Sequence, residues 1–160
     1  MPRRCWLVKS EPGSFSFADL LAAPARTTPW DGVRNYQARN FMRDEMRVGD
    51  AVLFYHSGAT PPGVVGLAEV ASEPYPDPTQ FDEGSRYFDP KSRPDEPRWQ
   101  LIDLRAVREL ASMVTMGEIK SHPELRTMEV ARRGSRLSIT PVDCAHLDLV
   151  LEISERRSHG

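Results

Sequence analysis

Two stretches of this 160-residue chain decide its fold: Ala51-Val52-Leu53-Phe54-Tyr55 and Val64-Val65-Gly66-Leu67-Ala68-Glu69-Val70. Short apolar runs bounded by glycine, proline and aspartate are typical of β-strands. Gly49-Asp50 precedes the first run, and a turn region with Pro-Pro-Gly separates the two. Because the connection is short, the two strands are predicted to pair in antiparallel fashion.

Further strands are expected on both sides of this pair, over residues 4–9, 99–107 and 136–139. Four or five short strands interleaved with short helices predict an α+β domain with a mostly antiparallel, barrel-like sheet. The sequence contains no glycine-rich loop of the kind that binds nucleotide phosphates.

The helices are located by their expected start signals. Ser16 with Asp19 and Thr115 with Glu118 have the spacing of capping boxes. A helix is expected from about Asn35 and should end before Gly49. Another is expected from Thr140-Pro141-x-Asp143, because proline is tolerated in the first turn of a helix. Its predicted apolar stripe comprises Val142, His146, Leu149, Val150 and Ile153.

The segment 73–98 has a different composition, with six prolines, many charges and little periodicity. A loop of this length inside a compact domain is uncommon and is usually functional or mobile. Its four aromatic residues indicate that it packs on the body of the protein.

Composition restricts the class of protein. A formal net charge of −2 argues against a protein that coats nucleic acid non-specifically. No apolar run approaches the roughly 20 residues of a membrane span, and the N-terminus lacks the apolar core of a secretory signal.

Cys5 and Cys144 lie far apart without a C-x-x-C pattern. A disulfide framework or a zinc site is therefore not supported, and a cytoplasmic location is expected.

Two arginine clusters stand out against this acidic balance. Arg34, Arg39, Arg43 and Arg47 recur at spacings of four or five, and a second cluster lies at residues 132–136. These side chains either form solvated faces or line a groove that touches a few phosphates, and the sequence leaves both possibilities open.

The richest chemistry lies in residues 30–40, Trp-Asp-Gly-Val-Arg-Asn-Tyr-Gln-Ala-Arg-Asn. Aromatic rings beside carboxamides and guanidinium groups can hold a flat, polar ligand, and a nucleobase is the leading example. Trp30 is interpreted either as a core residue or as a ring exposed to a pocket. Asn35 can cap the following helix, read a base edge, or do both.

An ordered set of motifs resembles the EVE domain family. It comprises Trp6-x-x-Lys9-x-Glu11-Pro12, the stretch 30–40, Phe54-Tyr55-His56-Ser57, Gly63-Val64-Val65-Gly66, Tyr75-Pro76-Asp77, Asp89-Pro90-Lys91, Trp99 and Arg136-Leu137-Ser138-Ile139. This resemblance implies one domain over residues 2–153 with a PUA-like pseudo-β-barrel flanked by short helices, followed by a frayed tail over 154–160. It also implies a reader of modified bases, such as 5-methylcytosine in DNA.

The resemblance also implies a set of pocket residues. They are Lys9, Ser10, Trp30, Val33, Arg34, Asn35, Tyr55, His56 and Ser57, with Asp77 and Trp99 as weaker candidates. Arg34 is expected to brace the loop by pairing with Asp31 or Asp50, or to reach a phosphate. Trp6 and Trp99 are interpreted as core residues.

Binding is favoured over catalysis. His56 and Ser57 are adjacent, and adjacent strand residues point to opposite faces. Asp77, Asp82 and Asp89 lack the spacing of metal ligands. We therefore predict a non-catalytic module that reads a modified base in DNA or RNA, without a cofactor, metal or membrane partner. A nucleic-acid-processing enzyme and a protein-interaction adaptor are the alternatives.

Overall fold

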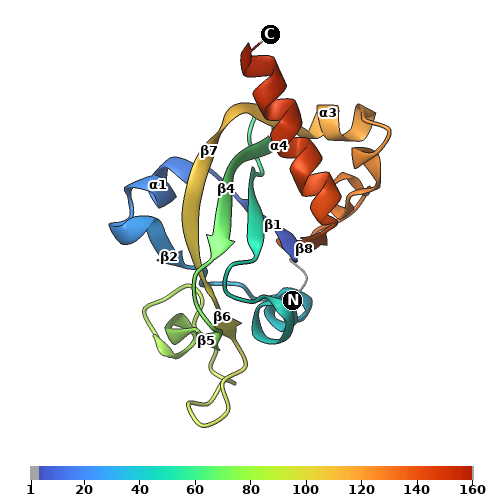
Figure 1. The fold of residues 1–160 in the computed structure, drawn as a ribbon. Coiled ribbons are helices and arrows are strands. Elements are labelled where there is room, and N and C mark those ends of the chain that lie inside the picture. Colours follow the sequence, from blue (N-terminus) through green and yellow to red (C-terminus); the bar gives the residue numbers. More distant parts are fainter. Residues whose placement is uncertain (1–3, 160) are drawn as a thin grey trace.

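The two predicted strands, β3 (Ala51–His56) and β4 (Gly63–Val70), form the centre of a six-stranded sheet in the computed structural model, which describes residues 4–159 (Figure 1). They pair in antiparallel fashion, as predicted. The strand order is β2-β7-β4-β3-β1-β8, with β1 (Cys5–Ser10) running parallel to β3. β7 (Asp103–Thr115) pairs with β4, while β2 (Thr27–Pro29) and β8 (Ile139–Val142) form the edges.

The sheet curls into a half-barrel, which confirms the predicted α+β class with a barrel-like sheet (Figure 1). Register shifts in the β3–β4 and β4–β7 pairings mark irregularities of the kind that bend strands. At Gly66 on β4, a Cβ atom would lie 2.4 Å from the Phe17 ring. Glycine is therefore needed there for Phe17 to pack against the strand.

One face of the sheet is covered by two helices near the N-terminus. These are α1 (Phe17–Ala22) and α2 (Tyr36–Asn40), the latter continuing as the π-helical turn η2 (Phe41–Glu45). The core on this face contains Trp6, which is fully buried as predicted, together with Phe54 and Met42. The 3₁₀ turn η1 (Pro24–Arg26) joins α1 to β2.

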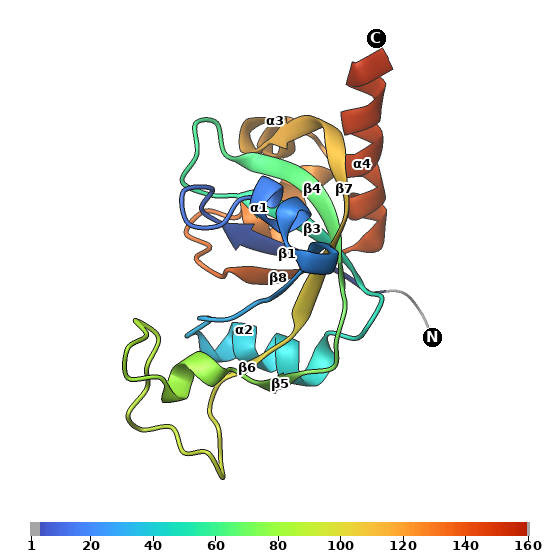
Figure 2. The same ribbon diagram turned by 90° about the vertical axis from the view of Figure 1, so that its left-hand side faces the viewer.

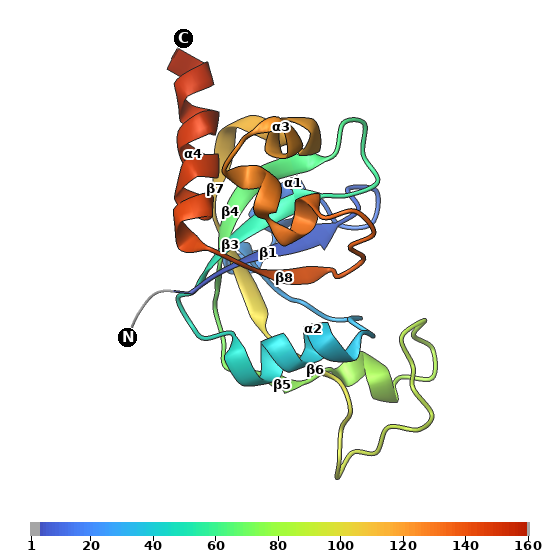
Figure 3. The same ribbon diagram turned by 90° about the vertical axis from the view of Figure 1, so that its right-hand side faces the viewer.

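The opposite face is covered by the C-terminal elements (Figure 3). They are α3 (Met116–Ser121), the 3₁₀ turns η4 (Leu125–Thr127) and η5 (Glu129–Ala131), and α4 (Cys144–His159). Both predicted capping boxes are present, at Ser16 for α1 and at Thr115 for α3.

The long segment 73–98 packs on the body of the protein, as predicted, and extends beside α2 (Figure 2). It contains β5 (Tyr75–Pro76) and the 3₁₀ turn η3 (Pro78–Phe81), and β5 pairs with β6 (Gln100–Leu101). Gln80 is fully buried at its centre. Its amide donates hydrogen bonds to the carbonyls of Asp77 and Trp99, both at 2.8 Å, and accepts one from the Trp99 amide at 3.0 Å.

The C-terminal part differs from the prediction. Thr140, Pro141 and Val142 belong to β8 and do not begin a helix, and α4 starts two residues after the strand ends. The predicted apolar stripe is confirmed in part, because Val150 is buried and Val142, Leu149 and Ile153 pack against the same core. The stripe omitted Leu147 and Ser154, which are also buried. The tail is not frayed from residue 154, since α4 continues to His159. The predicted domain start at Pro2 and tail end at Gly160 lie outside the described residues.

The prediction that the two cysteines remain unconnected is wrong. Cys5 and Cys144 form a disulfide with a Cα–Cα distance of 5.3 Å across a sequence separation of 139 residues. The cause is strand pairing, because β8 lies beside β1 with Val142 opposite Cys5. Separately, none of the helices over residues 4–159 is long and apolar enough to cross a membrane.

Candidate functional site

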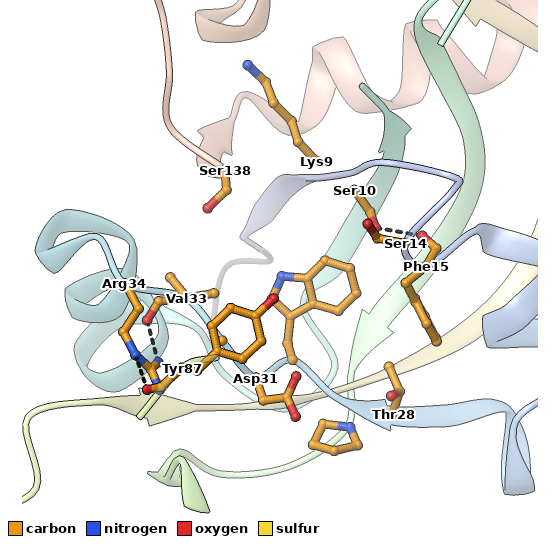
Figure 4. Close-up of a pocket in the computed structure, with 13 residues that line it drawn as sticks. Lys9, Ser10, Ser14, Phe15, Thr28, Asp31, Val33, Arg34, Tyr87 and Ser138 are labelled. Atoms are coloured by element: carbon orange, nitrogen blue, oxygen red, sulfur yellow. Dashed lines mark hydrogen bonds between the residues drawn. The ribbon is translucent and has the colours of Figure 1, made fainter. Parts of the chain in front are cut away.

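A cavity of about 430 Å³ opens where the end of β1, the segment from β2 to α2 and the long loop meet (Figure 4). The turn after β1 and the residue preceding β8 complete its wall. The lining residues are Lys9, Ser10, Ser14, Phe15, Thr28, Pro29, Trp30, Asp31, Gly32, Val33, Arg34, Tyr87 and Ser138. Five of the predicted site residues are therefore brought together here: Lys9, Ser10, Trp30, Val33 and Arg34.

Trp30 is both a pocket residue and a partner of the core. Its amide donates a 2.9 Å hydrogen bond to the Ile102 carbonyl, which holds the backbone beside β7. Its ring meets Phe54 and Phe15 edge to face, at centroid distances of 5.6 and 6.3 Å. The half-buried indole is thus held rigidly by the core and still lines the cavity.

Asp77 braces the floor of the site without lining it. Its carboxylate, 1% exposed, accepts hydrogen bonds from the Gly32 amide at 2.8 Å, from Arg34 Nη1 at 3.1 Å and from Thr79. Burial alone would raise the pKa of Asp77, but these hydrogen bonds lower it below its ordinary value. The expected partners of Arg34, Asp31 and Asp50, are thus incorrect, and Asp77 takes that place.

Tyr87 brings the long loop into the cavity. Arg34 Nε and Nη2 donate hydrogen bonds to the Tyr87 carbonyl at 3.1 and 2.7 Å. The phenol ring packs directly on Gly32, where a Cβ atom would lie 2.6 Å from the ring and where φ is +77°. Gly32 is therefore required both for its conformation and for this close contact.

Two ionisable groups of the cavity have no hydrogen-bonding side-chain partner within the described residues, and they lie across the cavity from one another (Figure 4). Partial burial and the nearby charge of Asp77 raise the pKa of Asp31. Partial burial lowers the pKa of Lys9, with Glu129 opposing that shift. Partial burial thus disfavours the charged form of both groups, and shifted pKa values of this kind are a common property of functional sites.

Four predicted pocket residues do not line the cavity. Asn35 Oδ1 accepts a 2.9 Å hydrogen bond from the Ala38 amide and so caps α2. Tyr55 is 3% exposed and belongs to the core on the opposite face of the sheet, because side chains alternate along β3. His56 Nε2 accepts from the Phe17 amide at 3.1 Å, and the Ser57 amide donates to the Ser10 carbonyl.

Trp99 lies behind the pocket wall, close to its predicted core role with 6% exposure. Its ring stacks on Tyr36 at a centroid distance of 4.8 Å, and its Nε1 donates to Asp89 Oδ2 at 2.7 Å. The Arg34 guanidinium lies 5.1 Å from the ring centroid.

Eight lining residues were missed by sequence reasoning. Asp31 and Gly32 lay within the chemically rich stretch and were detectable there. The others reach the cavity through tertiary packing, and the sequence offered no local signal for them as ligand contacts: Ser14, Phe15, Thr28, Pro29, Tyr87 and Ser138. The described residues also contain no group of three or more His, Cys, Asp or Glu side chains placed to hold a metal ion.

Residues 4–153 match the EVE domain family. The chain belongs to the EVE domain family. It is 41% identical to human thymocyte nuclear protein 1 over 94% of this chain and 74% of that protein. The crystal structure of the human protein, THYN1, in complex with DNA containing 5-methylcytosine superposes with a TM-score of 0.88 at 40% identity, covering 95% of this chain and 98% of that one.

Two further structures support the same fold. A protein from Leishmania major has a TM-score of 0.90 at 44% identity, with coverage of 98% of this chain and 97% of that chain. A YTH domain from Zygosaccharomyces rouxii, solved with N6-methyladenosine RNA, has a TM-score of 0.56 at 14% identity, covering 96% and 87%. The latter likeness shows that this EVE domain shares its fold with YTH domains.

Proposed function

We propose that this EVE domain protein is a nucleic-acid-binding module that reads a modified base, with a modified cytosine in DNA as the favoured ligand. The observation that carries the proposal is the cavity itself, which is lined by an indole held by the core together with Asp31 and Lys9, two charged groups without a side-chain hydrogen-bond partner in the described structure. The complex of human THYN1 with 5-methylcytosine DNA, at 40% identity, supports the choice of ligand class.

Stacking on an aromatic ring supplies the affinity in this proposal. A base inside a duplex must first be extruded, which costs a few kcal/mol. Stacking on an aromatic side chain contributes about 1–3 kcal/mol per base. Trp30 is suited to this role because Phe54 and Phe15 already hold its ring, so little side-chain entropy remains to be lost.

The polar groups of the cavity then select the base. An ionised aspartate only accepts hydrogen bonds, and the exocyclic amino group of cytosine is a donor. Asp31 therefore favours cytosine over thymine, which presents a carbonyl at that position. Ser138, across the cavity from Asp31, can donate to the base carbonyl, and Lys9 can do so by rotating its side chain, which points away from Asp31 in Figure 4.

The added methyl group requires a small apolar surface, and Val33 provides one in the cavity wall. Burying one methyl contributes about 0.8 kcal/mol, which corresponds to only a few-fold in affinity. Selectivity for 5-methylcytosine over cytosine is therefore expected to be modest.

We further propose that the module acts without catalysis. His56 is held by the Phe17 amide outside the cavity, so it is not placed to activate a serine there. The competing enzyme hypothesis is tested by incubating the protein with 5-methylcytosine DNA and Mg²⁺ and analysing the DNA for strand breaks or altered bases. A product that depends on the protein would refute a binding-only role.

Fluorescence polarisation with matched oligonucleotides tests the reading of the base. The set contains one 5-methylcytosine, cytosine or thymine at the same position in DNA, and one 5-methylcytosine in RNA. Wild type should prefer 5-methylcytosine over cytosine by a few-fold. Asp31→Ala should weaken that binding about tenfold and reduce discrimination against thymine. Glu83→Ala, on the exposed part of the long loop, is the control and should change nothing. Equal affinity for all bases would contradict the proposal.

A further inference from the structure

A second hollow, of about 380 Å³, lies between α2 and the end of the long loop. We call it the basic groove, because five of its seven lining residues are cations and one is a carboxylate. The lining residues are Arg39, Arg43, Lys91, Arg93, Glu96, Pro97 and Arg98. Two of the arginines come from the cluster at residues 34–47, and the long loop supplies the other cations.

The basic groove adjoins the base cavity through Trp99. The Arg34 guanidinium, which lines the cavity, lies 5.1 Å from the Trp99 ring centroid, and the Arg39 guanidinium, which lines the groove, lies 6.0 Å from it. Arg39 Nη1 also donates a 2.8 Å hydrogen bond to the Arg98 carbonyl, which ties the helix to the loop. Guanidinium groups from both sites therefore contact the same indole.

The positive charge of the groove is only partly neutralised. Arg43 pairs with Asp44 and Arg93 with Asp95, but these pairs are exposed and so contribute little. Within the described residues, the side chains of Lys91 and Arg98 have neither an ion-pair nor a hydrogen-bond partner. Counting Glu96, Asp44, Asp95 and Asp89, whose pKa is lowered by its hydrogen bond from Trp99 and in part by the charge of Arg98, against the five cations leaves an excess of one positive charge.

The cations also repel one another. Burial lowers the pKa of Arg39, and the neighbouring charge of Arg43 lowers it further. Arg39 is held in this arrangement by its contacts with the Tyr36 ring and with Asn40. An anion bound in the groove would relieve this repulsion.

We infer that the basic groove binds the sugar–phosphate backbone of the nucleic-acid strand whose base occupies the cavity. This inference rests on the proposed function. Guanidinium groups match phosphate oxygens in geometry and charge. A protein with a net charge of −2 cannot attract nucleic acid by its overall charge, so a local cationic track must supply that attraction. An acidic peptide fits the charge of the groove, but not its position beside a base-sized cavity.

Salt dependence of binding tests the inference. The double variant Lys91→Gln/Arg98→Gln removes two side-chain cations that have no hydrogen-bond or ion-pair partner in the described structure. Arg126→Gln is the control, since the Arg126 side chain is exposed on η4 and likewise has no such partner there. Dissociation constants for an oligonucleotide with one 5-methylcytosine are measured over a series of salt concentrations. The double variant should reduce the magnitude of the slope of log Kd against log salt concentration by about 0.7–0.9 for each cation that contacts a phosphate. Arg126→Gln should retain the wild-type slope.

Binding of the free nucleoside 5-methyl-2′-deoxycytidine separates this inference from the proposed function, because the nucleoside has no phosphate. The double variant should bind it with wild-type affinity. If the double variant has the same salt slope as wild type for the oligonucleotide, the inference is overturned. Poly-glutamate serves as the acidic-peptide probe: if the double variant loses binding to it while the oligonucleotide slope is unchanged, the groove binds acidic peptides and the inference is again overturned. If wild type shows no preference among bases, the base-reading proposal fails while the slope still reports on the groove.

Discussion

Trp30 shows how one residue can satisfy two interpretations that its sequence context left open. A tryptophan between proline and aspartate is compatible either with a core residue or with a ring exposed to a pocket. In the structure the ring packs edge to face on Phe54 and Phe15 and still lines the cavity. Trp30→Ala is therefore expected to reduce stability as well as binding, so Trp30→Phe is the better variant for isolating its stacking role.

His56 illustrates the opposite case, in which a chemically attractive side chain has a structural role. Its Nε2 accepts the amide of Phe17, the first residue of α1, so the ring must be neutral at that nitrogen. Such amides at a helix N-terminus have no partner within the helix. Burial lowers the pKa of His56.

A pH dependence of stability follows from the lowered pKa of His56. Below about pH 6.5 the unfolded chain takes up a proton at this residue before the folded chain does, so the free energy of unfolding should decrease as pH falls. Above that pH, the stabilisation that neutral His56 gives to the folded protein is fully present. Denaturant unfolding over a pH series should give a shallower dependence for His56→Gln, whose carbonyl can still accept the Phe17 amide. Identical pH profiles for the two proteins would refute this assignment.

Individual helices and strands could be predicted wherever the residues that determine them lie close together in the sequence. Both capping boxes and the β3–β4 pair were expected from residues close together in sequence, and the structure contains them. The C-terminal strand was misassigned because Pro141 is compatible with both the first turn of a helix and an edge strand. β8 is an edge strand paired only with β1 in the described sheet, so a missing amide is tolerated there.

The site was only partly predictable for the same reason. Residues 30–34 form one continuous wall of the cavity, and their chemistry is visible in the sequence. Tyr87 and Ser138 reach it from distant segments, which no local pattern reports. Tyr55 was assigned to the pocket through the family resemblance, but the alternation of side chains along β3 places it in the opposite core.

Helix α2 provides a test of the revised role of Asn35. Because Asn35 caps α2 and lies outside the cavity, Asn35→Ala should lower the free energy of unfolding by about 1 kcal/mol and leave oligonucleotide affinity unchanged. Asn35→Ser, which retains a capping oxygen, should recover most of that stability. Calorimetry and polarisation measure the two properties. A large loss of affinity with unchanged stability would instead assign Asn35 to base recognition.

At the scale of the whole molecule, the Cys5–Cys144 disulfide joins β1 to the start of α4 and closes almost the entire chain into a loop. Sequence spacing could not report it, because the two residues approach only after β8 pairs with β1. The same C-terminal helix is anchored at its other end, where the Ser154 hydroxyl donates to the Ser112 carbonyl at 2.6 Å.

Removal of this disulfide should destabilise the protein. Loss of a native disulfide typically costs about 2–5 kcal/mol, chiefly because the unfolded chain gains freedom. Denaturant midpoints are compared for wild type with and without reductant and for the double variant Cys5→Ser/Cys144→Ser. Reduced wild type and the double variant should show a similar loss, whereas a midpoint insensitive to reductant would contradict the bond in solution.

The three indole groups of the chain allow the central claim to be tested directly. Trp6 Nε1 donates to Asp50 and Trp99 Nε1 to Asp89, whereas Trp30 lines the cavity. The measurement is a proton–nitrogen correlation NMR titration with 5-methyl-2′-deoxycytidine. We predict that the Trp30 indole and Gly32 amide signals shift while the buried Trp6 indole signal stays in place. Saturable binding that leaves the Trp30 and Gly32 signals unchanged would contradict the assignment of this cavity as the base-reading site.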